Sequence, residues 1–404
     1  MVTPDIFARE ADKIADELSR YAIRRGPGAA WIGIDCLGDA EVFQLAPLGP
    51  DLYNGLSGIG VFLAAHAAVR GRDSSAGLAL ASIARLRKNL KGRNAARVAR
   101  SLGIGGATGL GSIVYALTLM SKYLDARDLQ TDAHAVVDLF TDDLIAADKQ
   151  LDIIGGSAGA ILCLLRLYRD SQSERVLARA LRCGEHLIAQ RRHGTDGRRT
   201  WLGQGSGPRA LNGMSHGAAG FAYALASLGA VTGRDEFAQA AFECIEFENS
   251  SSSADRNNWP DLRVSDASSW PCQWCHGAPG IGLARIATAK LAGVNAAAYL
   301  TDIQHAVKGV RAGWPGAVDT LCCGTLGSVE FFCEAGKILD SGELRELATK
   351  RLIDVLSAEK STGDLRWNAG KRQFNLGLFR GLSGVGYTAL RQIEPSLANV
   401  LIWE

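Results

Sequence analysis

The sequence lacks an apolar run long enough to cross a membrane as a helix, and its first residues lack the pattern of a secretion signal. It also lacks an excess of one charge. The 44 Lys and Arg against 42 Asp and Glu leave a net charge of +2, so we expect no binding to nucleic acid and no attraction to an anionic membrane. Its nine cysteines are an odd number and do not resemble the disulfide framework of a small secreted protein. These absences together predict a cytoplasmic protein in a reducing setting.

Glycine is abundant, with 47 residues, and much of it belongs to one recurring pattern. Gly-x-x-Gly followed by an apolar run occurs seven times, at intervals of 47 to 61 residues. A single Gly-x-x-Gly motif is weak evidence of structure. A regular series of such motifs at this period, however, is typical of stacked supersecondary units that can bury a core only together. The copies begin at Gly55, Gly106, Gly156, Gly217, Gly277, Gly324 and Gly381.

The segments between the glycines predict two kinds of helix. The runs 59–65, 113–117, 160–165 and 221–225 are apolar on nearly all sides, which is typical of buried helices. Segments such as 131–151 and 174–189 are amphipathic and fit an outer, half-exposed layer. One inner and one outer helix per unit account for the period, and the glycines suit helix starts where backbones pack closely.

An open stack of such units needs polar capping repeats, and none is evident, so we expect a closed ring rather than an open solenoid. The predicted fold is all-α, a double-layered (α/α)7 toroid with a central cavity, spanning residues 51–404. Residues 1–50 are expected to be a helical lead-in packed on the toroid, with an amphipathic helix over 4–24. The polar segments 193–212 and 249–269 are expected to be surface loops, or else a rim that touches a substrate.

The residues just before the glycines differ between copies and carry the candidate chemistry. Cys275 precedes one motif by two residues, and Cys322 and Cys323 precede the next. A ring brings these three thiols to one end, where they fit a zinc ion with an open fourth position, the pattern of a catalytic site. The alternative is buried, inert cysteine. Cys272, in Cys-Gln-Trp-Cys, is a possible fourth ligand that would close the site.

Four further residues are candidates for catalytic roles at the same end. His216 directly precedes a repeat glycine and is expected to transfer a proton. His276 has the same placement, but it follows a predicted ligand and its ring has the alternative of turning away. Asp152 either hydrogen-bonds a histidine or caps a helix. Arg380 either holds a carbonyl or enolate oxygen or forms an ordinary ion pair.

These motifs together resemble the LanC-type lanthipeptide cyclases, and most closely the carboxy-terminal cyclase domain of class II lanthipeptide synthetases. The resemblance extends from about residue 51 to 404 and rests on five segments, which are Asp51–Gly58, Met214–Gly220, Trp274–Gly280, Cys322–Gly324 and Phe379–Gly386. It implies a seven-fold α/α toroid, one Zn²⁺ on Cys275, Cys322 and Cys323, His216 as acid/base and Asp152 beside it. Several stand-alone members have an arginine four residues before the first zinc cysteine; Pro271 stands there in this chain, so that role is not transferred.

The resemblance implies a lanthionine-forming cyclase of lantibiotic (RiPP) biosynthesis. A peptide cysteine thiol would add, in a Michael-type reaction, to dehydroalanine or dehydrobutyrine in a dehydrated precursor (leader–core) peptide, closing a thioether ring. A dehydratase domain or protein is a further expected partner. The alternatives are a LanC-like protein that binds thiols or peptides without catalysis, and a zinc-dependent cysteine prenyltransferase. The sequence leaves open the precursor peptide, the ring pattern and stereochemistry, the oligomeric state, and whether the chain is a stand-alone enzyme or a piece of a longer synthetase.

Overall fold

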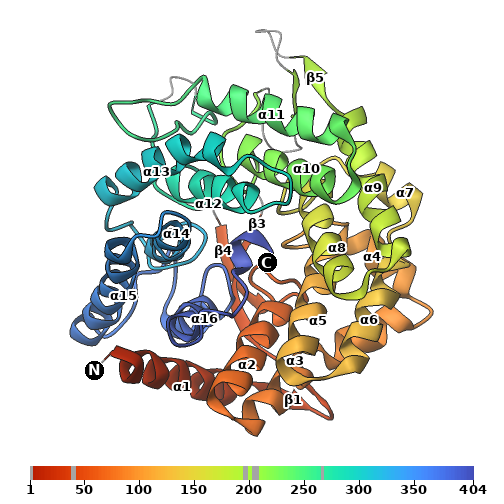
Figure 1. Cartoon of the computed structure of the whole chain (residues 1–404). Helices are drawn as coiled ribbons and strands as arrows, with labels where there is room; N and C mark the ends of the chain where they lie inside the picture. The colour runs from red at the N-terminus through yellow and green to blue at the C-terminus, as the bar shows by residue number, and fades with distance from the viewer. Residues whose placement is uncertain (1–2, 38–41, 194–198, 203–208, 265–267) are drawn as a thin grey trace.

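The computed structural model describes residues 3–37, 42–193, 199–202, 209–264 and 268–404. Within them, seven helices form an inner ring around a common centre (Figure 1). Each inner helix contacts the next, and α16 contacts α2, so the ring closes. The inner helices are α2 (Leu56–Arg70), α5 (Leu110–Leu124), α8 (Ser157–Ser171), α10 (Ala218–Thr232), α12 (Ala278–Ala289), α14 (Thr325–Ile338) and α16 (Leu382–Ile393). The predicted apolar runs lie within α2, α5, α8 and α10, and the all-α toroid is confirmed.

An outer helix packs against each inner one. Six outer helices follow their partners in the chain: α3 (Asp73–Lys91), α6 (Arg127–Val137), α9 (Glu174–Ala189), α11 (Asp235–Asn249), α13 (Leu300–Ala312) and α15 (Gly342–Thr362). The seventh is α1 (Thr3–Tyr21), which packs against α16 and so pairs the two ends of the chain (Figure 1). Arg372, in the segment before α16, also binds α1 through ion pairs with Glu17 at 2.7 Å and Glu10 at 3.1 Å.

Shorter elements connect the pairs. The segment predicted as amphipathic over 131–151 is divided, because α6 ends at Val137 and α7 follows a turn. The shorter elements are α4 (Ala95–Leu102), α7 (Asp142–Ala146), β5 (Arg192–His193), β6 (Arg199–Thr200) and the 3-10 turns η2 (Ala296–Tyr299), η3 (Arg372–Phe374) and η4 (Val400–Ile402). In the two polar segments, residues 194–198, 203–208 and 265–267 lie outside the described residues. No described helix is long and apolar enough to cross a membrane.

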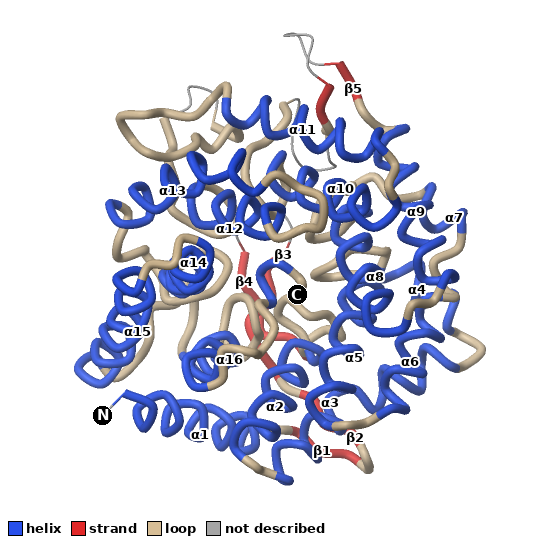
Figure 2. Tube along the Cα trace, in the orientation of Figure 1, coloured by secondary structure: helices blue, strands red, loops and turns tan. Residues whose placement is uncertain are grey.

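The expectation of a wholly helical lead-in is wrong for the described residues 23–37 and 42–47. Two antiparallel hairpins follow α1 (Figure 2), formed by β1 (Ile23–Arg25), β2 (Gly28–Ala30), β3 (Ile32–Leu37) and β4 (Val42–Pro47). The alternation of Ile32 with Ile34, and of Phe43 with Leu45, is a strand period that the helix-based interpretation overlooked. The division between residues 50 and 51 stays a prediction.

A ring of backbone hydrogen bonds joins all seven units at one end. Each inner helix is capped by a glycine, and the residue two or three positions before it donates its N–H to the corresponding carbonyl of the next unit. The pairs, in order, are Phe379 to Tyr53 (2.8 Å), Tyr53 to Ala107 (3.1 Å), Ala107 to Ile154 (3.0 Å), Ile153 to Ser215 (3.2 Å), Ser215 to Cys275 (3.3 Å), Cys275 to Cys322 (3.3 Å) and Cys322 to Phe379 (3.0 Å). These bonds satisfy backbone groups that would otherwise be buried without partners.

This ring of bonds defines one end of the toroid, which we call the rim. The residues immediately before the capping glycines are the rim positions: Asn54, Thr108, Gly155, His216, His276, Cys323 and Arg380. In the second repeat the helix start lies three residues later than the Gly-x-x-Gly pattern predicted, since α5 begins after Gly109 rather than Gly106. Gly106 serves close packing instead, because a Cβ there would lie 2.6 Å from the Cα of Gly159.

The centre of the ring is packed by the last residues of the chain (Figure 1). Trp403 is 3% exposed and its indole N–H donates to the carbonyl of Gly106 at 3.0 Å. The indole of Trp274 and the hydroxyl of Tyr223 donate to the carbonyls of Leu401 and Ile402. These contacts bind the end of the chain to three inner units.

Candidate metal centre and its surroundings

Three thiols converge at the rim between α12 and α14. The Sγ atoms of Cys275 and Cys323 are 3.6 Å apart, and those of Cys322 and Cys323 are 3.4 Å apart. All three sulfurs lie within 4.8 Å of one another, in an arrangement able to hold a metal ion. The hydrogen bond from the N–H of Cys275 to the carbonyl of Cys322 aligns the two units that carry them. The sequence prediction that these three residues meet agrees with this geometry.

Cys272 lies outside this cluster. Its thiol points toward the carbonyl of Gly309 at 3.9 Å, and burial raises its pKa to about 11. The cluster of thiols therefore has three members among the described residues, and the alternative with Cys272 as a fourth ligand is not supported.

Burial and crowding make the three thiols unequal. Burial raises the pKa of Cys322, with the neighbouring thiols adding to the effect. The pKa of Cys323 is lowered by hydrogen bonding between its sulfur and those of Cys275 and Cys322, and Arg380 adds a favourable charge. Three thiolates this close would repel one another strongly, so full ionisation of the cluster requires a cation between them.

Tyr53 is a contact of this cluster that sequence reasoning missed. Its hydroxyl donates to the Sγ of Cys322 at 2.9 Å, and its ring stacks on Phe379 with centroids 5.1 Å apart. Burial and the nearby sulfurs raise its pKa well above the usual value, so the hydroxyl stays protonated and remains a donor. A signal existed: Tyr53 and Cys322 each stand two residues before a capping glycine, so the repeat register alone puts them at equivalent places.

His216 and Asp152 form a hydrogen-bonded pair beside the thiols. The Oδ2 atom of Asp152 lies 2.6 Å from the Nδ1 atom of His216. The Oδ1 atom of Asp152 accepts from the backbone N–H of Gly155 at 2.8 Å, inside the turn that starts α8. The histidine contact expected as one alternative is present, whereas the helix-cap alternative is not, because Gly156 caps α8 without a side-chain hydrogen bond and the second oxygen of Asp152 stabilises the preceding turn. Asp152 is buried, whereas the side chain of His216 is 39% exposed.

His276 faces the same region but is more deeply buried than His216. Its ring centroid lies 6.0 Å from that of His216, and the residue is 3% exposed. Burial, helped by the positive charge of Arg263, lowers its pKa to about 4, so it is neutral near pH 7. Arg263 forms an ion pair with Asp261 at 2.6 Å and belongs to the polar segment 249–269. Arg263 interacts electrostatically with Cys275 and Cys323, so this segment approaches the thiols, and its contact with a substrate stays a prediction.

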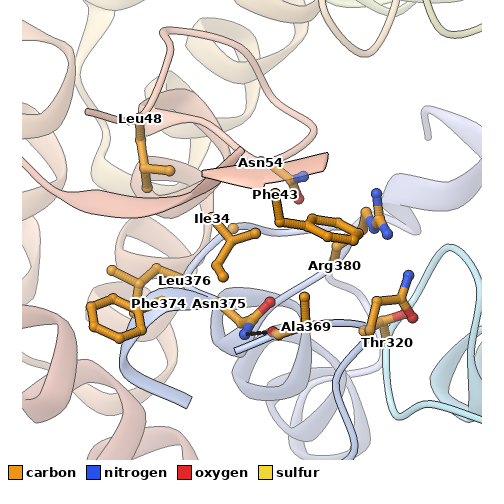
Figure 3. A pocket seen from close by; sticks show the side chains of 12 residues that line it. Ile34, Phe43, Leu48, Asn54, Thr320, Ala369, Phe374, Asn375, Leu376 and Arg380 are labelled. Atoms are coloured by element: carbon orange, nitrogen blue, oxygen red, sulfur yellow. Dashed lines mark hydrogen bonds between the residues drawn. The ribbon is translucent and has the colours of Figure 1, made fainter. Parts of the chain in front are cut away.

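Arg380 occupies the rim position next to Cys323 and lines a narrow hollow (Figure 3). Asn54 and Thr320 line the same hollow, and Ile34 and Phe43 of the β3–β4 hairpin close its outer side. The hairpin therefore extends over the rim, where it also contacts η3. This position puts a guanidinium close to the thiols and to any substrate that reaches them.

A second, wider cavity of about 440 Å³ lies beside His216, on the side away from the thiols. Thr108, Gly155 and Asp152 line it, together with residues of α4 and of the segment after α7. The imidazole of His216 thus lies between this cavity and the ring of His276.

With this geometry described, comparison with known proteins identifies the family. A family model described as "Lanthionine synthetase C-like protein" matches residues 46–403. The chain belongs to the LanC-like family. Nisin cyclase superposes on this LanC-like chain with a TM-score of 0.68 at 16% sequence identity, covering 98% of this chain and 97% of that one. A family 76 glycoside hydrolase (mannosidase) from Bacteroides thetaiotaomicron VPI-5482 has a TM-score of 0.50 at 12% identity, covering 96% of this chain and 99% of that one.

At such identities these likenesses show the fold of the LanC-like chain and not its activity. Comparison with curated protein sequences gives no match.

Proposed function

We propose that this LanC-like protein is a zinc-dependent lanthionine cyclase, acting in the cytoplasm on a dehydrated precursor peptide. The observation that carries the proposal is the placement of three clustered thiols beside the His216–Asp152 pair on one rim. A protein that only bound thiols would have no need of an oriented imidazole at this place. A dehydratase, as a separate protein or a fused domain, would supply the substrate.

The thiol cluster fits zinc by its chemistry and its spacing. A tetrahedral zinc ion with Zn–S bonds of about 2.3 Å separates its sulfurs by roughly 3.8 Å. The two measured separations, 3.4 and 3.6 Å, are close to that value. Cys275, Cys322 and Cys323 would hold the ion, and Tyr53 would keep its hydrogen bond to one of them. Bound there, zinc would lower the pKa of a substrate thiol at its open position.

His216 would handle the proton of the reaction. Its Nδ1 faces the carboxylate of Asp152, which leaves Nε2 as the atom that exchanges protons with the substrate. In the addition, a bond forms between the peptide sulfur and the β-carbon of the dehydro residue. The proton lost by the thiol is matched by a proton gained at the α-carbon, so the peptide mass does not change.

Two other residues would assist. Arg380 would stabilise negative charge that develops on the substrate carbonyl oxygen as the sulfur attacks. His276, neutral and buried, would form a wall of the site rather than a proton donor. The prenyltransferase alternative has no aspartate in the metal cluster among the described residues, so nothing favours it.

The experiment supplies purified protein with a synthetic peptide that contains one cysteine and one dehydroalanine. We expect about one zinc per chain by elemental analysis, loss of the free thiol, and an unchanged peptide mass. Protein stripped of metal by a chelator should leave the thiol free, and added zinc should restore the reaction. A thiol that stays free in the presence of the zinc-loaded protein would refute the cyclase assignment.

A further inference from the structure

The cavity of about 440 Å³ beside His216 has a cause in the ring register. Gly155 is the one rim position without a side chain, and its neighbour in the ring, Thr108, carries a short one. The hollow opens beside these two residues. Its volume lies within the range of roughly 300–1,000 Å³ that is usual for ligand sites. We call it the rim cavity.

The formal charges that line the rim cavity balance, with two cations and two carboxylates, but the two kinds of group differ in their contacts. Arg100, from the end of α4, and Lys149 both line it and are exposed. Neither cation has an ion pair with an acidic side chain among the residues that the structure describes. Two carboxylates also line the cavity, but hydrogen-bond donors already hold both of them.

Asp148 accepts from the N–H and hydroxyl of Ser157, at 2.7 and 2.6 Å, and from two backbone N–H groups at 2.9 and 3.2 Å. Asp152 is held by His216 and by the N–H of Gly155. The two cations are therefore the charges available to a ligand, and they fit an anion.

The position of the cavity indicates which kind of anion it would bind. In the proposed reaction the peptide cysteine lies at the thiol cluster and the dehydro residue lies at His216. The rim cavity continues from His216 on the side away from the thiols, so peptide residues next to the dehydro residue reach it.

We propose that the rim cavity binds a carboxylate of the substrate peptide, paired with Arg100 and Lys149, next to the dehydro residue. The inference rests on the proposed function. The carboxylate is either an Asp or Glu side chain or the carboxy terminus of a peptide that ends there. It would hold the electrophile against His216 while the thiol is held on the opposite side.

The test measures binding and needs no ring closure, so it is separate from the test of catalysis. Three fluorescein-labelled peptides contain cysteine and have serine in place of dehydroalanine, which makes them unreactive. The first has two Glu beside the serine and an amidated end. The second has Gln instead of Glu and an amidated end. The third has Gln and a free carboxy terminus directly after the serine.

We expect the first or the third peptide to bind the zinc-loaded protein about threefold to tenfold more tightly than the second in anisotropy titrations at low salt, the range for one or two exposed ion pairs. Tighter binding of the first peptide assigns the cavity to side-chain carboxylates, and tighter binding of the third assigns it to the carboxy terminus. The advantage should shrink at high salt.

Variants locate the effect. The double variant Arg100→Glu/Lys149→Glu should abolish or reverse the advantage. Arg97→Glu reverses one charge on α4, half the change of the double variant, at a position that does not line the cavity, and it should keep the advantage. Gly155→Leu should weaken the binding of all three peptides, because the leucine side chain fills the space. The fold should tolerate this change, since the three atoms nearest to a Cβ at this position belong to the flexible side chain of Gln150, the first at 3.1 Å. Equal binding of all three peptides, or an advantage that survives the double charge reversal, would overturn the proposal.

Discussion

Replacing Asp152 by asparagine tests whether this carboxylate acts through His216. The Oδ1 atom of Asp152 accepts from the N–H of Gly155, and an asparagine oxygen can keep that bond. The amide NH2 then faces Nδ1 of the imidazole at the place where Oδ2 now lies, 2.6 Å away. Because an amide NH2 donates, Nδ1 must accept, and the ring hydrogen moves to Nε2. The ring can then no longer take up a second proton without opposing two donors.

We expect Asp152→Asn to slow ring closure by about 10²- to 10⁴-fold, the range for loss of a general acid or base. In activation free energy this corresponds to about 3 to 5 kcal/mol. Folding stability should fall by only about 1 kcal/mol, because one hydrogen bond weakens and the turn bond persists. Zinc content should not change, since the three thiols are untouched. Rate, zinc stoichiometry and unfolding free energy are to be measured on one preparation.

Asp51 provides a matched control. It stands four residues before the capping glycine of α2, as Asp152 does before that of α8, and its Oδ1 accepts from the N–H of Asn54 at 2.9 Å. No described histidine contacts it. Asp51→Asn should therefore alter stability by a similar amount and leave the rate within about twofold, because it changes only the turn.

The double variant decides between a joint and a separate role. If Asp152 acts through the imidazole, then Asp152→Asn should cost almost nothing further in a His216→Asn background. An additional loss as large as in the native protein would refute the reasoning, and so would a loss of zinc in either single variant, since His216 would then be a ligand.

Three further outcomes are expected. Cys323→Ala should lose zinc and ring closure while circular dichroism shows an intact fold, because the core is spread over seven units; unfolding on zinc removal would instead make the metal structural. Tyr53→Phe should weaken zinc binding by about 10- to 100-fold in chelator competition, since it removes the hydrogen bond to Cys322, and unchanged affinity would contradict that role. Burial raises the pKa of Glu334, but the charges of Lys290 and Arg391 outweigh this effect and hold that pKa at about 2. The ionised carboxylate therefore stabilises the fold above pH 4.5, and this contribution to the free energy of unfolding declines as the pH falls toward 2. Denaturant unfolding should show the deficit of Glu334→Gln narrowing over that interval, and a constant deficit would exclude this ionisation as the cause.

The helical ring and the meeting of three thiols were predictable from the sequence, because both follow from a repeat. Identical Gly-x-x-Gly starts place successive inner helices in equivalent positions, so residues at the same offset must share one end of the ring. The same logic failed at the second copy, because the glycine that caps α5 is Gly109, which is followed three residues later by Ser112 rather than by a second glycine. Only the backbone hydrogen bond from Tyr53 to Ala107 shows which glycine caps α5.

The tertiary structure alone decided the contacts between units that lack a common motif. The two hairpins after α1 have no repeat to mark them, and their short alternating segments are ambiguous by period. The contacts of Arg263 and the rim cavity depend on side-chain direction and on which loops fold back over the rim. Asp152 shows the difference most clearly: the sequence permits a helix cap or a histidine contact, and only the folded chain shows one oxygen on the histidine and the other in the turn before α8, where Gly156 caps the helix.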